Sequence, residues 1–357
     1  MQNNSDPATT LRRLIDGFQV SQAIHVAATL RIADLLASGS RTADELAADT
    51  DTHAPTLYRL LRALASVEIL REGNDREFEL APLGQQLRSD VVGSMADWAG
   101  FVGSPGYWQA WSGLTHSVRT GENAFRHIHA TDVWSYRASR ADESAVFDRA
   151  MTALSRRSSA ALIAAYDFGR FRTVVDVGGG TGALLAAILG AHPGLHGILI
   201  DQPHVVAAAG AFMERAGVLD RCRIVGGSFF DAVPEGADAY VLRSVIHDWE
   251  DVDAIRILTM VGNAMAADGR VLLMERIVAP PNEGRDAKFS DLNMLVAPGG
   301  RERTREEFEA LLGLAGLRVA AVIDAGGFAV IEALPNQRAD EASRRSTDEA
   351  RNEDGEI

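Results

Sequence analysis

A glycine-rich turn after a buried strand is the first feature that could do chemistry. Residues 174–177 (VVDV) run into residues 178–182 (GGGTG), and a helical pattern follows. Glycines permit positive φ and let a ligand approach the backbone, while the next helix offers free N–H groups. The following strand ends in Asp201, 25 residues after Asp176, where a carboxylate can hold a ribose diol. The sequence therefore predicts a site for a nucleotide-like ligand.

Two ligands are compatible with this turn. The spacing of Gly178, Gly180 and Ala183 satisfies the relaxed dinucleotide fingerprint, in which the helix N-terminus receives a pyrophosphate. S-adenosylmethionine has no phosphate but carries a sulfonium and an amino acid. The acid Asp176 at the strand end, followed by glycines at every second position, suits that cationic ligand better than NAD. A tight turn with no ligand is the structural alternative.

A histidine and two glutamates follow later strands. His247 stands just beyond the predicted strand at residues 239–242, Glu275 follows the next one, and Glu302 lies in the loop of residues 298–304. The carboxyl ends of strands in an open sheet face the ligand. An imidazole with its ordinary pKa of about 6.5 suits a proton acceptor at neutral pH. A carboxylate beside His247 would fix its tautomer and stabilise the imidazolium. The group predicts general-base catalysis.

The neighbours of these residues are expected to be structural. Asp248 is expected to cap the following helix and Trp249 to pack under the cofactor. A capping box at Thr304 and Glu307 predicts the start of another helix. The arginines that surround this motif are expected to form a solvated charge run, and they are Arg301, Arg303 and Arg305.

From residue 172 onward, short apolar runs alternate with helical patterns. Such alternation predicts an α/β, doubly wound sheet. The last two runs, at 317–323 and 327–334, are separated by a short turn and predict an antiparallel pair at the sheet edge. The other expected strands span 173–177, 197–200, 223–225, 239–242 and 270–274, with helices at 183–189, 205–216 and 251–266.

The N-terminal part predicts a mostly helical, winged-helix domain. Apolar residues recur at helical spacing over 8–37, on more than one face, so a partner subunit could cover one of them. Two short helices, the first opened by a capping box at Thr42 and Glu45, precede a hairpin over 69–80. Residues 1–95 hold nine arginines and thirteen acidic residues, a net charge of −4, which is the wrong sign for a phosphate-binding module. A dimerising role fits better than DNA binding.

The chain divides into four segments by pattern. Residues 1–95 form the winged-helix-like domain, and 96–165 a helical linker that ends in a helix over 142–165. Residues 166–335 form the catalytic domain, and 336–357 a tail too poor in apolar residues to order. Four of the five tryptophans lie in the linker, where they either pack a core or wall an apolar substrate pocket; they are Trp98, Trp108, Trp111 and Trp134.

Composition excludes several classes of protein. The net charge of −14 disfavours nucleic acid and anionic membranes as partners. No apolar stretch approaches the roughly 20 residues that span a bilayer, and the start has no leader pattern. The single cysteine, Cys222, can form no internal disulfide, and without a second one a zinc site is not expected. We expect a cytoplasmic protein with no metal.

The motifs together resemble those of the plant-type small-molecule O-methyltransferases and their bacterial relatives in antibiotic and pigment pathways. The resemblance covers most of residues 10–334. It implies a Rossmann-like class I methyltransferase domain behind a winged-helix dimerisation domain, and a homodimer that binds S-adenosylmethionine. The motifs are DVGGGTG (176–182), LIDQPHVV (199–206), HDW (247–249) and DLNMLVAPGGRERTREEF (291–308).

The resemblance also implies roles for individual residues. Cofactor contacts would come from Asp176, Gly178 and Gly180 at the amino acid end, Asp201 at the ribose, Ser228 and Phe229 at the adenine, and Arg243. His247 would be the general base, flanked by Glu275 and Glu302, and acceptor contacts would come from Met151, Asn293, Met294 and Trp108. Relatives commonly have an acid at the position of Ser228 and often a lysine at that of Arg243.

The implied reaction is methylation of a hydroxyl, expected to be phenolic, on an aromatic or polyketide-like small molecule. The alternative is a repurposed scaffold that keeps the cofactor for hydroxylation, decarboxylation or a pericyclic step. A ligand-responsive DNA-binding regulator is a further alternative, disfavoured by the negative charge of residues 1–95.

Overall fold

The computed structural model describes residues 6–336, which fall into two compact units. The first unit comprises residues up to 112 together with 137–157, and the second comprises 113–136 together with the residues from 158 onward. The predicted linker of residues 96–165 is thus shared between the two units. The tail predicted to be disordered lies, except for Asn336, outside the described residues. Within residues 6–336, no helix has both the length and the apolar character needed to cross a membrane.

The first unit confirms the winged-helix outline but not the single long helix. The pattern over 8–37 forms three helices, α1 (Pro7–Ile15), α2 (Gly17–Thr29) and α3 (Ile32–Leu35). The break before α3 falls at Arg31, whose φ of +56° is left-handed and cannot continue a helix. The predicted capping box is present, since Thr42 accepts the N–H of Glu45 and Glu45 accepts that of Thr42.

A small sheet completes the winged helix. Its strand order is β1-β3-β2, with both pairs antiparallel. The core of this domain packs the helices after α3 against the sheet, around Leu46, Leu61 and Phe78. Further elements of the unit are β1 (Arg41–Thr42), α4 (Ala43–Thr50), α5 (Ala54–Ala65), β2 (Leu70–Glu72), β3 (Glu77–Leu80), α6 (Ala96–Val102) and α7 (Pro105–Ser112).

The first helices leave apolar side chains uncovered in the single chain. No residue of α1 is buried, and Leu11, Leu14, Ile15 and Phe18 are each more than half exposed. This agrees with the expectation that one face of the N-terminal helical segment is covered by a partner subunit.

The second unit is built on a seven-stranded sheet of order β6-β5-β4-β7-β8-β10-β9. The pairings from β6 to β8 are parallel, whereas β10 runs antiparallel to both β8 and β9. The predicted doubly wound sheet and antiparallel edge are confirmed. The strands are β4 (Thr173–Val177), β5 (His196–Asp201), β6 (Cys222–Gly226), β7 (Ala239–Arg243), β8 (Arg270–Glu275), β9 (Leu317–Asp324) and β10 (Ala329–Pro335).

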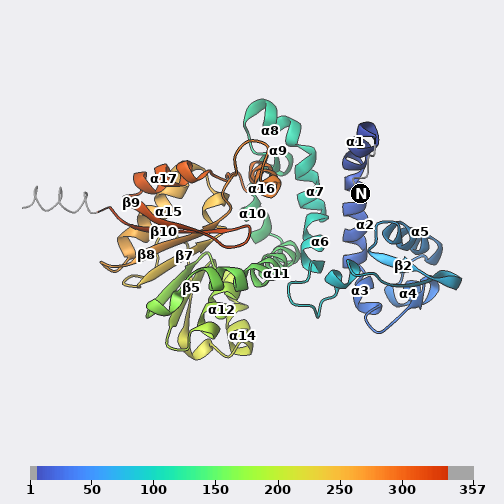
Figure 1. Cartoon of the computed structure of the whole chain (residues 1–357), viewed down its shortest axis with the longest axis horizontal. Coiled ribbons are helices and arrows are strands. Elements are labelled where there is room, and N and C mark those ends of the chain that lie inside the picture. Colours follow the sequence, from blue (N-terminus) through green and yellow to red (C-terminus); the bar gives the residue numbers. More distant parts are fainter. Residues whose placement is uncertain (1–5, 337–357) are drawn as a thin grey trace, which may run out of the picture. The chain divides into compact units, whose positions relative to one another are not determined.

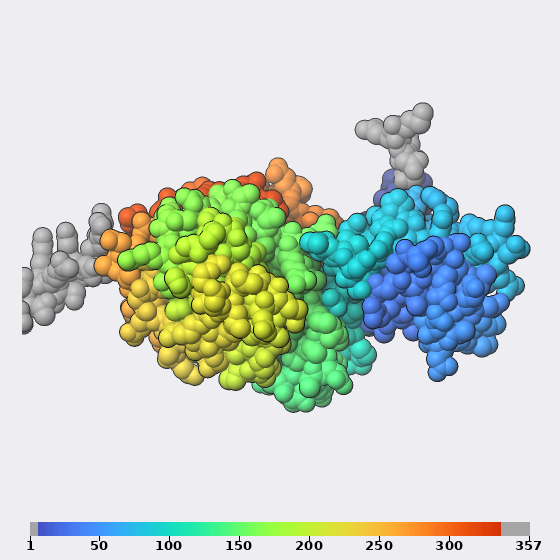
Figure 2. Space-filling model, turned by 90° about the horizontal axis from the view of Figure 1, so that it is seen from below, coloured from blue at the N-terminus to red at the C-terminus, as the bar shows by residue number. Residues whose placement is uncertain are grey.

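Helices cover both faces of this sheet (Figure 1). On one face, α15 (Asp251–Ala264) and α17 (Arg305–Leu314) pack Ile257 and Phe308 into a core with Tyr240. On the other, α12 (Ala183–Ala191) and α14 (Ala209–Arg215) pack with the end of α11 (Ala141–Ala165). In the space-filling view, the residues from α12 to β6, coloured green to yellow, lie next to one another on one face of the second unit (Figure 2).

The remaining helices of the second unit are short, apart from α16. The predicted helix over 205–216 is two helices, since Pro203 begins α13 (Pro203–Val206) and α14 follows it. The others are α8 (Leu114–Thr120), α9 (Ala124–His129), α10 (Val133–Ala138), which crosses the boundary between the units, and α16 (Arg285–Val296).

The hydroxyl of Tyr240 offers a test of the core of the second unit. It lies 2.5 Å from the carbonyl oxygen of Pro234 and 2.8 Å from that of Ala264, and the side chain is fully buried. Tyr240→Phe removes the donor to Pro234 and the acceptor of the buried N–H of Ala237, so urea unfolding should show a free energy of unfolding lower by about 1–3 kcal/mol. Tyr58→Phe, which removes a hydroxyl bonded to the exposed Glu72, is the control. An unchanged unfolding midpoint for Tyr240→Phe would contradict the prediction.

Candidate active site

The glycine turn after β4 has the predicted left-handed backbone. Gly178, Gly180 and Gly182 have φ of +70°, +62° and +83°. A Cβ atom on Gly178 would lie 2.9 Å from Cγ2 of Val245, so the turn packs directly on the segment after β7. A Cβ on Gly180 would meet no described atom within 4 Å, so the backbone there is open to a ligand.

Two carboxylates flank this turn. Asp201 at the end of β5 accepts the N–H of Gly180 at 2.8 Å through Oδ2 and that of Gln202 at 2.6 Å through Oδ1. Asp176 is 2% exposed, and among the described residues its Oδ2 has no hydrogen-bond partner. Burial raises the pKa of Asp176 to about 7, against the opposing charge of Arg243. A buried, unpartnered carboxylate atom beside an open glycine backbone fits a ligand with a cationic, hydrogen-bonding end.

The other predicted cofactor residues lie around the same strand ends. Phe229 comes within 3.5 Å of the Cβ position on Gly178, so its ring borders the turn. The hydroxyl of Ser228 accepts the N–H of Phe230 at 3.2 Å and shapes the loop that carries Phe229. Arg243 ends β7, donates to Ser158 at 2.5 Å and lies over the ring of Phe328. Burial lowers the pKa of Arg243 to about 10.

The predicted His247, Glu275 and Glu302 come together at the carboxyl end of the sheet. Ser244, with a left-handed φ of +52°, turns the chain out of β7 into a 3₁₀ turn, Ile246–Asp248. Nδ1 of His247 lies 2.9 Å from Oε1 of Glu302 and 3.7 Å from Oε2 of Glu275. All three side chains are buried. Ser244, whose left-handed backbone is strained, thus lies at the start of the turn that places the imidazole of His247.

Each carboxylate is itself held by other groups. Oε1 of Glu275 accepts the N–H groups of Val245 at 3.1 Å and Ile246 at 2.9 Å, so Glu275 also fixes the backbone that carries His247. Oε1 of Glu302 accepts the hydroxyl of Ser290 at 2.6 Å, and the backbone N–H of Glu302 donates to Asp291 at 2.9 Å. Sequence reasoning missed Ser290 and Asp291, because only the packing of α16 brings them to Glu302.

The charges in this cluster oppose one another. Burial by itself lowers the pKa of His247, but the charges of Glu275 and Asp248 and the hydrogen bond to Glu302 outweigh it and raise that pKa to about 10. Burial raises the pKa of Glu275 to about 7, partly offset by His247. Burial also tends to raise the pKa of Glu302, but the hydrogen bond and charge of His247 lower it on balance. The imidazolium form of His247 is therefore strongly stabilised.

The same three residues could in principle hold a metal ion. One ligand atom from each lies within 4.8 Å of the others. However, the imidazole nitrogen that faces both carboxylates is the one at hydrogen-bond distance from Glu302, and the raised pKa of His247 favours a proton there. The geometry favours an acid–base group, and the expectation of no metal stays a prediction.

Two expectations about neighbouring residues are wrong. The N-cap of α15 is Glu250 and not Asp248, whose Oδ1 instead lies 3.6 Å from Nε2 of His247. Arg303 is not solvated, since its side chain is 1% exposed. Arg301 and Arg305 do form partly exposed pairs, with Glu307 and Glu309. A sequence run cannot show which of three arginines the fold turns inward.

Trp249 packs as expected of a structural neighbour. Its ring makes T-shaped contacts with Phe229 at 6.0 Å and Phe230 at 4.7 Å, and it stacks on Trp134 at 6.2 Å. Trp249 thus contacts the ring of Phe229, which borders the glycine turn, and the expectation that it packs under the cofactor stays a prediction.

The residues predicted to contact the acceptor are divided between the two units. Asn293 and Met294 lie on α16, which also carries Ser290 and Asp291, and Met294 is 5% exposed. Trp108 lies on α7 and Met151 on α11, both within the first unit. The assignment of these four residues to an acceptor site stays a prediction.

The fold and site described above define a class I methyltransferase: a Rossmann-like sheet with an antiparallel edge, a glycine turn after its first strand and an acidic residue after the second. Comparison with known families narrows this class. Residues 111–318 match the O-methyltransferase domain, and residues 12–90 match the O-methyltransferase dimerisation domain. The chain belongs to the O-methyltransferase family, whose enzymes use S-adenosylmethionine. The dimerisation domain supports a homodimer.

Relatives match nearly the whole chain. The phenazine O-methyltransferase PhzM of Lysobacter antibioticus is 40% identical over 329 residues, which is 92% of this chain and 96% of that protein. The crystal structure of LaPhzM superposes with a TM-score of 0.90 at 40% identity, covering 92% of this chain and 99% of that one.

Two further relatives bear on the chemistry. The O-methyltransferase NcsB1 from neocarzinostatin biosynthesis, solved with S-adenosylmethionine and 2-hydroxy-5-methyl naphthoic acid, superposes with a TM-score of 0.77 at 36% identity, covering 88% of this chain and 96% of that one. The aclacinomycin 10-hydroxylase RdmB of Streptomyces purpurascens is 36% identical over 305 residues, which is 84% of this chain and 81% of that protein.

The electrostatics of the cluster make a pH prediction. A histidine with a raised folded-state pKa stabilises the fold fully below its unfolded pKa of about 6.5, and this stabilisation is lost as pH rises through the folded pKa of about 10. NMR titration of ¹³C-labelled histidine should show His247 titrating well above 6.5, with the signal assigned by its absence in His247→Gln. Glu302→Gln should lower the pKa of His247, because it removes one of the negative charges that raise it. A wild-type value at or below 6.5 would contradict the cluster's charge balance.

The glycine turn makes a binding prediction. Gly178→Ala places a Cβ against Val245 in a left-handed conformation, so it should weaken S-adenosylhomocysteine binding at least tenfold by calorimetry. Gly190→Ala, on α12 with open space around it, is the matched control and should leave affinity unchanged. Equal affinity for Gly178→Ala and wild type would show that no ligand lies on this turn.

Proposed function

We propose that this enzyme transfers a methyl group from S-adenosylmethionine to a hydroxyl oxygen, typically a phenol, of an aromatic or polyketide-like small molecule, with His247 as general base. The observation that carries the proposal is the orientation of the buried imidazole. Its Nδ1 is engaged by Glu302 at 2.9 Å, which leaves Nε2 as the nitrogen that can take a proton from an acceptor.

The cofactor would be held by the glycine turn and the strand ends around it. The unpartnered Oδ2 of Asp176 would meet the cationic amino acid end, with Gly178 and Gly180 allowing close approach. Asp201 would hold the ribose hydroxyls, Ser228 and Phe229 would border the adenine, and the charge of Arg243 would favour the ionised form of Asp176. S-adenosylmethionine supplies an electrophilic methyl group when it is bound.

The chain's own residues would orient the acceptor and remove its proton. Glu302 and Glu275 hold the imidazole by its Nδ1 side and stabilise the imidazolium that forms when Nε2 accepts the hydroxyl proton. The high pKa of His247 makes it a strong base once neutral, and a cationic ligand beside the cluster favours the neutral form. Turnover should therefore rise with pH through the pKa of His247.

The acceptor would be an aromatic small molecule. The relative NcsB1 was solved with a hydroxy-naphthoic acid, and PhzM is named for a phenazine. Apolar and polar contacts would come from Trp108, Met151, Asn293 and Met294, and the acidic chain suits a neutral or cationic acceptor over nucleic acid or membrane. A single cysteine, which can form no internal disulfide, fits a cytoplasmic setting.

A second candidate keeps the cofactor but not the methylation. It is favoured by the 36% identity to a protein named as a hydroxylase. The retained cluster of His247, Glu275 and Glu302 favours methylation, because a base is what an acceptor hydroxyl needs. Methylation makes a product about 14 mass units heavier, since a methyl replaces a hydrogen, together with one S-adenosylhomocysteine. Mass spectrometry of both products separates the two reactions.

The base assignment is tested by His247→Ala. General-base assistance is typically worth about 10²–10⁴-fold, so kcat should fall by that order while S-adenosylhomocysteine affinity stays within about threefold. The control is His196→Ala, since His196 is exposed at the amino end of β5, the opposite edge of the sheet from His247. Full activity of His247→Ala on a phenolic acceptor would overturn the assignment.

A further inference from the structure

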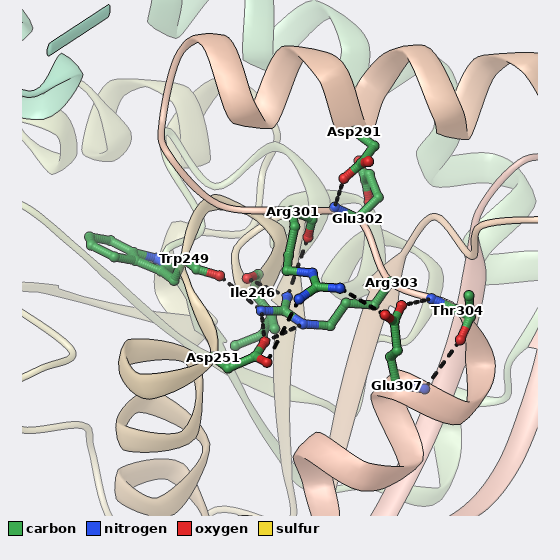
Figure 3. Close-up of polar contacts among 9 residues, drawn as sticks. All are labelled: Ile246, Trp249, Asp251, Asp291, Arg301, Glu302, Arg303, Thr304 and Glu307. Atoms are coloured by element: carbon green, nitrogen blue, oxygen red, sulfur yellow. Dashed lines mark hydrogen bonds and ion pairs between the residues drawn. The ribbon is translucent and has the colours of Figure 1, made fainter. Parts of the chain in front are cut away.

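Arg303 is a buried charge at the junction of the segments that carry the cluster. Its side chain is 1% exposed, and Nε and Nη2 both donate to Oδ1 of Asp251, at 3.1 and 2.7 Å (Figure 3). Asp251 lies in the first turn of α15 and is about half exposed. A buried guanidinium with one carboxylate partner needs further acceptors for its remaining N–H groups.

Those acceptors are backbone carbonyls on both sides of His247. Nη1 donates to the carbonyl of Ile246 at 3.2 Å, and Nη2 donates to that of Trp249 at 2.9 Å. Nη1 also reaches the carbonyl of Arg301 at 3.3 Å. One guanidinium thus holds the turn that presents His247 and spans to the segment in which Glu302 lies (Figure 3).

The backbone of Arg303 also contacts the segment that carries Glu275, the third member of the cluster. Arg303 bridges Ile277 in parallel register, and its carbonyl accepts the N–H of Val278 at 3.0 Å. This bridge continues the line of β8 just beyond Glu275. The segments carrying His247, Glu275 and Glu302 therefore all meet at one residue.

Gly300 shows how closely two of these segments approach. A Cβ on Gly300 would overlap the carbonyl oxygen of His247 and the backbone of Asp248 and Trp249. The loop before α17 thus lies directly on the turn of His247, backbone against backbone. The length of the hydrogen bond between His247 and Glu302 depends on this packing, since neither residue shares an element with the other.

We propose that Arg303 is a positioning residue for the reaction. Its guanidinium holds the turn of His247 against the segment of Glu302 and so fixes the orientation of the imidazole. The proposal rests on the proposed function, because it gives Arg303 no role apart from His247. A lysine keeps the charge but not the planar fork, so it cannot bind Asp251 and the carbonyls on both sides of the histidine together. Arg303→Lys therefore removes the lock with little change in charge.

The experiment combines Arg303→Lys with His247→Ala in a double-mutant cycle. Activity is followed as S-adenosylhomocysteine formation with 2-hydroxy-5-methyl naphthoic acid as the phenolic probe, and cofactor-site integrity by calorimetry with S-adenosylhomocysteine. Arg305→Lys, which alters an exposed pair with Glu309 two residues away, is the matched control.

Arg303→Lys should lower kcat by about 10–100-fold, the usual cost of a small misplacement of a reacting group, with S-adenosylhomocysteine affinity within about threefold. In the His247→Ala background the same change should cost less than about threefold, because the positioned group is already absent. Equal losses in both backgrounds, or wild-type kcat for Arg303→Lys, would overturn the proposal. Wild-type kcat for His247→Ala alone would instead overturn the proposed function.

A second readout needs no acceptor. His247 is faced by Asp248 on its own turn, Glu275 from β8 and Glu302 from the loop before α17, while Arg276 and Asp291 act on Glu302. If Arg303→Lys loosens the hydrogen bond between His247 and Glu302, the pKa of His247 measured by NMR should fall toward 6.5 by at least one pH unit. Any acid limb in the pH dependence of kcat should shift to lower pH as well. Arg305→Lys should not move it. An unmoved titration in Arg303→Lys would overturn the proposal even if the probe is not turned over.

A milder variant guards against misfolding. Asp251→Asn keeps an acceptor oxygen for the guanidinium but removes the ion pair, at a residue that is about half exposed. It should move the titration and kcat in the same direction as Arg303→Lys but less. A folded Asp251→Asn protein with wild-type titration and kcat would count against the proposal.

Discussion

The structure of the site depends on one constraint, which is that buried carboxylates must find donors. Glu275 and Glu302 are both fully or nearly fully buried, at the carboxyl ends of the strands of a sheet with a largely apolar core. The imidazole of His247 is the cation they share, and backbone N–H groups, Ser290 and the neighbouring loop supply the rest. Within the described residues, Oε2 of each glutamate has no hydrogen-bond partner, so the loss of a further donor would leave its charge still less compensated.

The same reasoning links the cluster to the cofactor site. Val245, which lies between the strained Ser244 and the turn of His247, packs against the position of Gly178, and its N–H is held by Glu275. The glycine turn and His247 are therefore supported by adjacent residues of one segment after β7. An open sheet brings these strand ends to a single edge, so cofactor and acceptor chemistry can share a rigid support while the loops beyond it vary.

Much of the second unit could be predicted because its signals are local. Buried parallel strands read as short apolar runs, and the observed bounds of β4 to β8 differ from the predicted ones by at most one residue at either end. The helical segments were less exact. The apolar pattern over 8–37 did not predict the break at Arg31, because the left-handed backbone of one arginine does not change the spacing of apolar residues. The helix predicted over 205–216 also divides in two, at Ala207 and Ala208, although both residues keep right-handed backbone angles.

By itself, the sequence determined the elements and the residue types that can do chemistry: the glycine turn, the acids at strand ends, and the histidine and glutamates after later strands. These follow from composition and spacing, which are properties of neighbours along the chain. Only the tertiary structure decided which of three arginines is buried, that Asp248 faces His247 and does not cap α15, and that Ser290 and Asp291 hold Glu302. Apart from the pair of Asp248 and His247, these contacts join different segments of the chain, so they depend on how helices and loops pack against the sheet, and no local pattern records that packing.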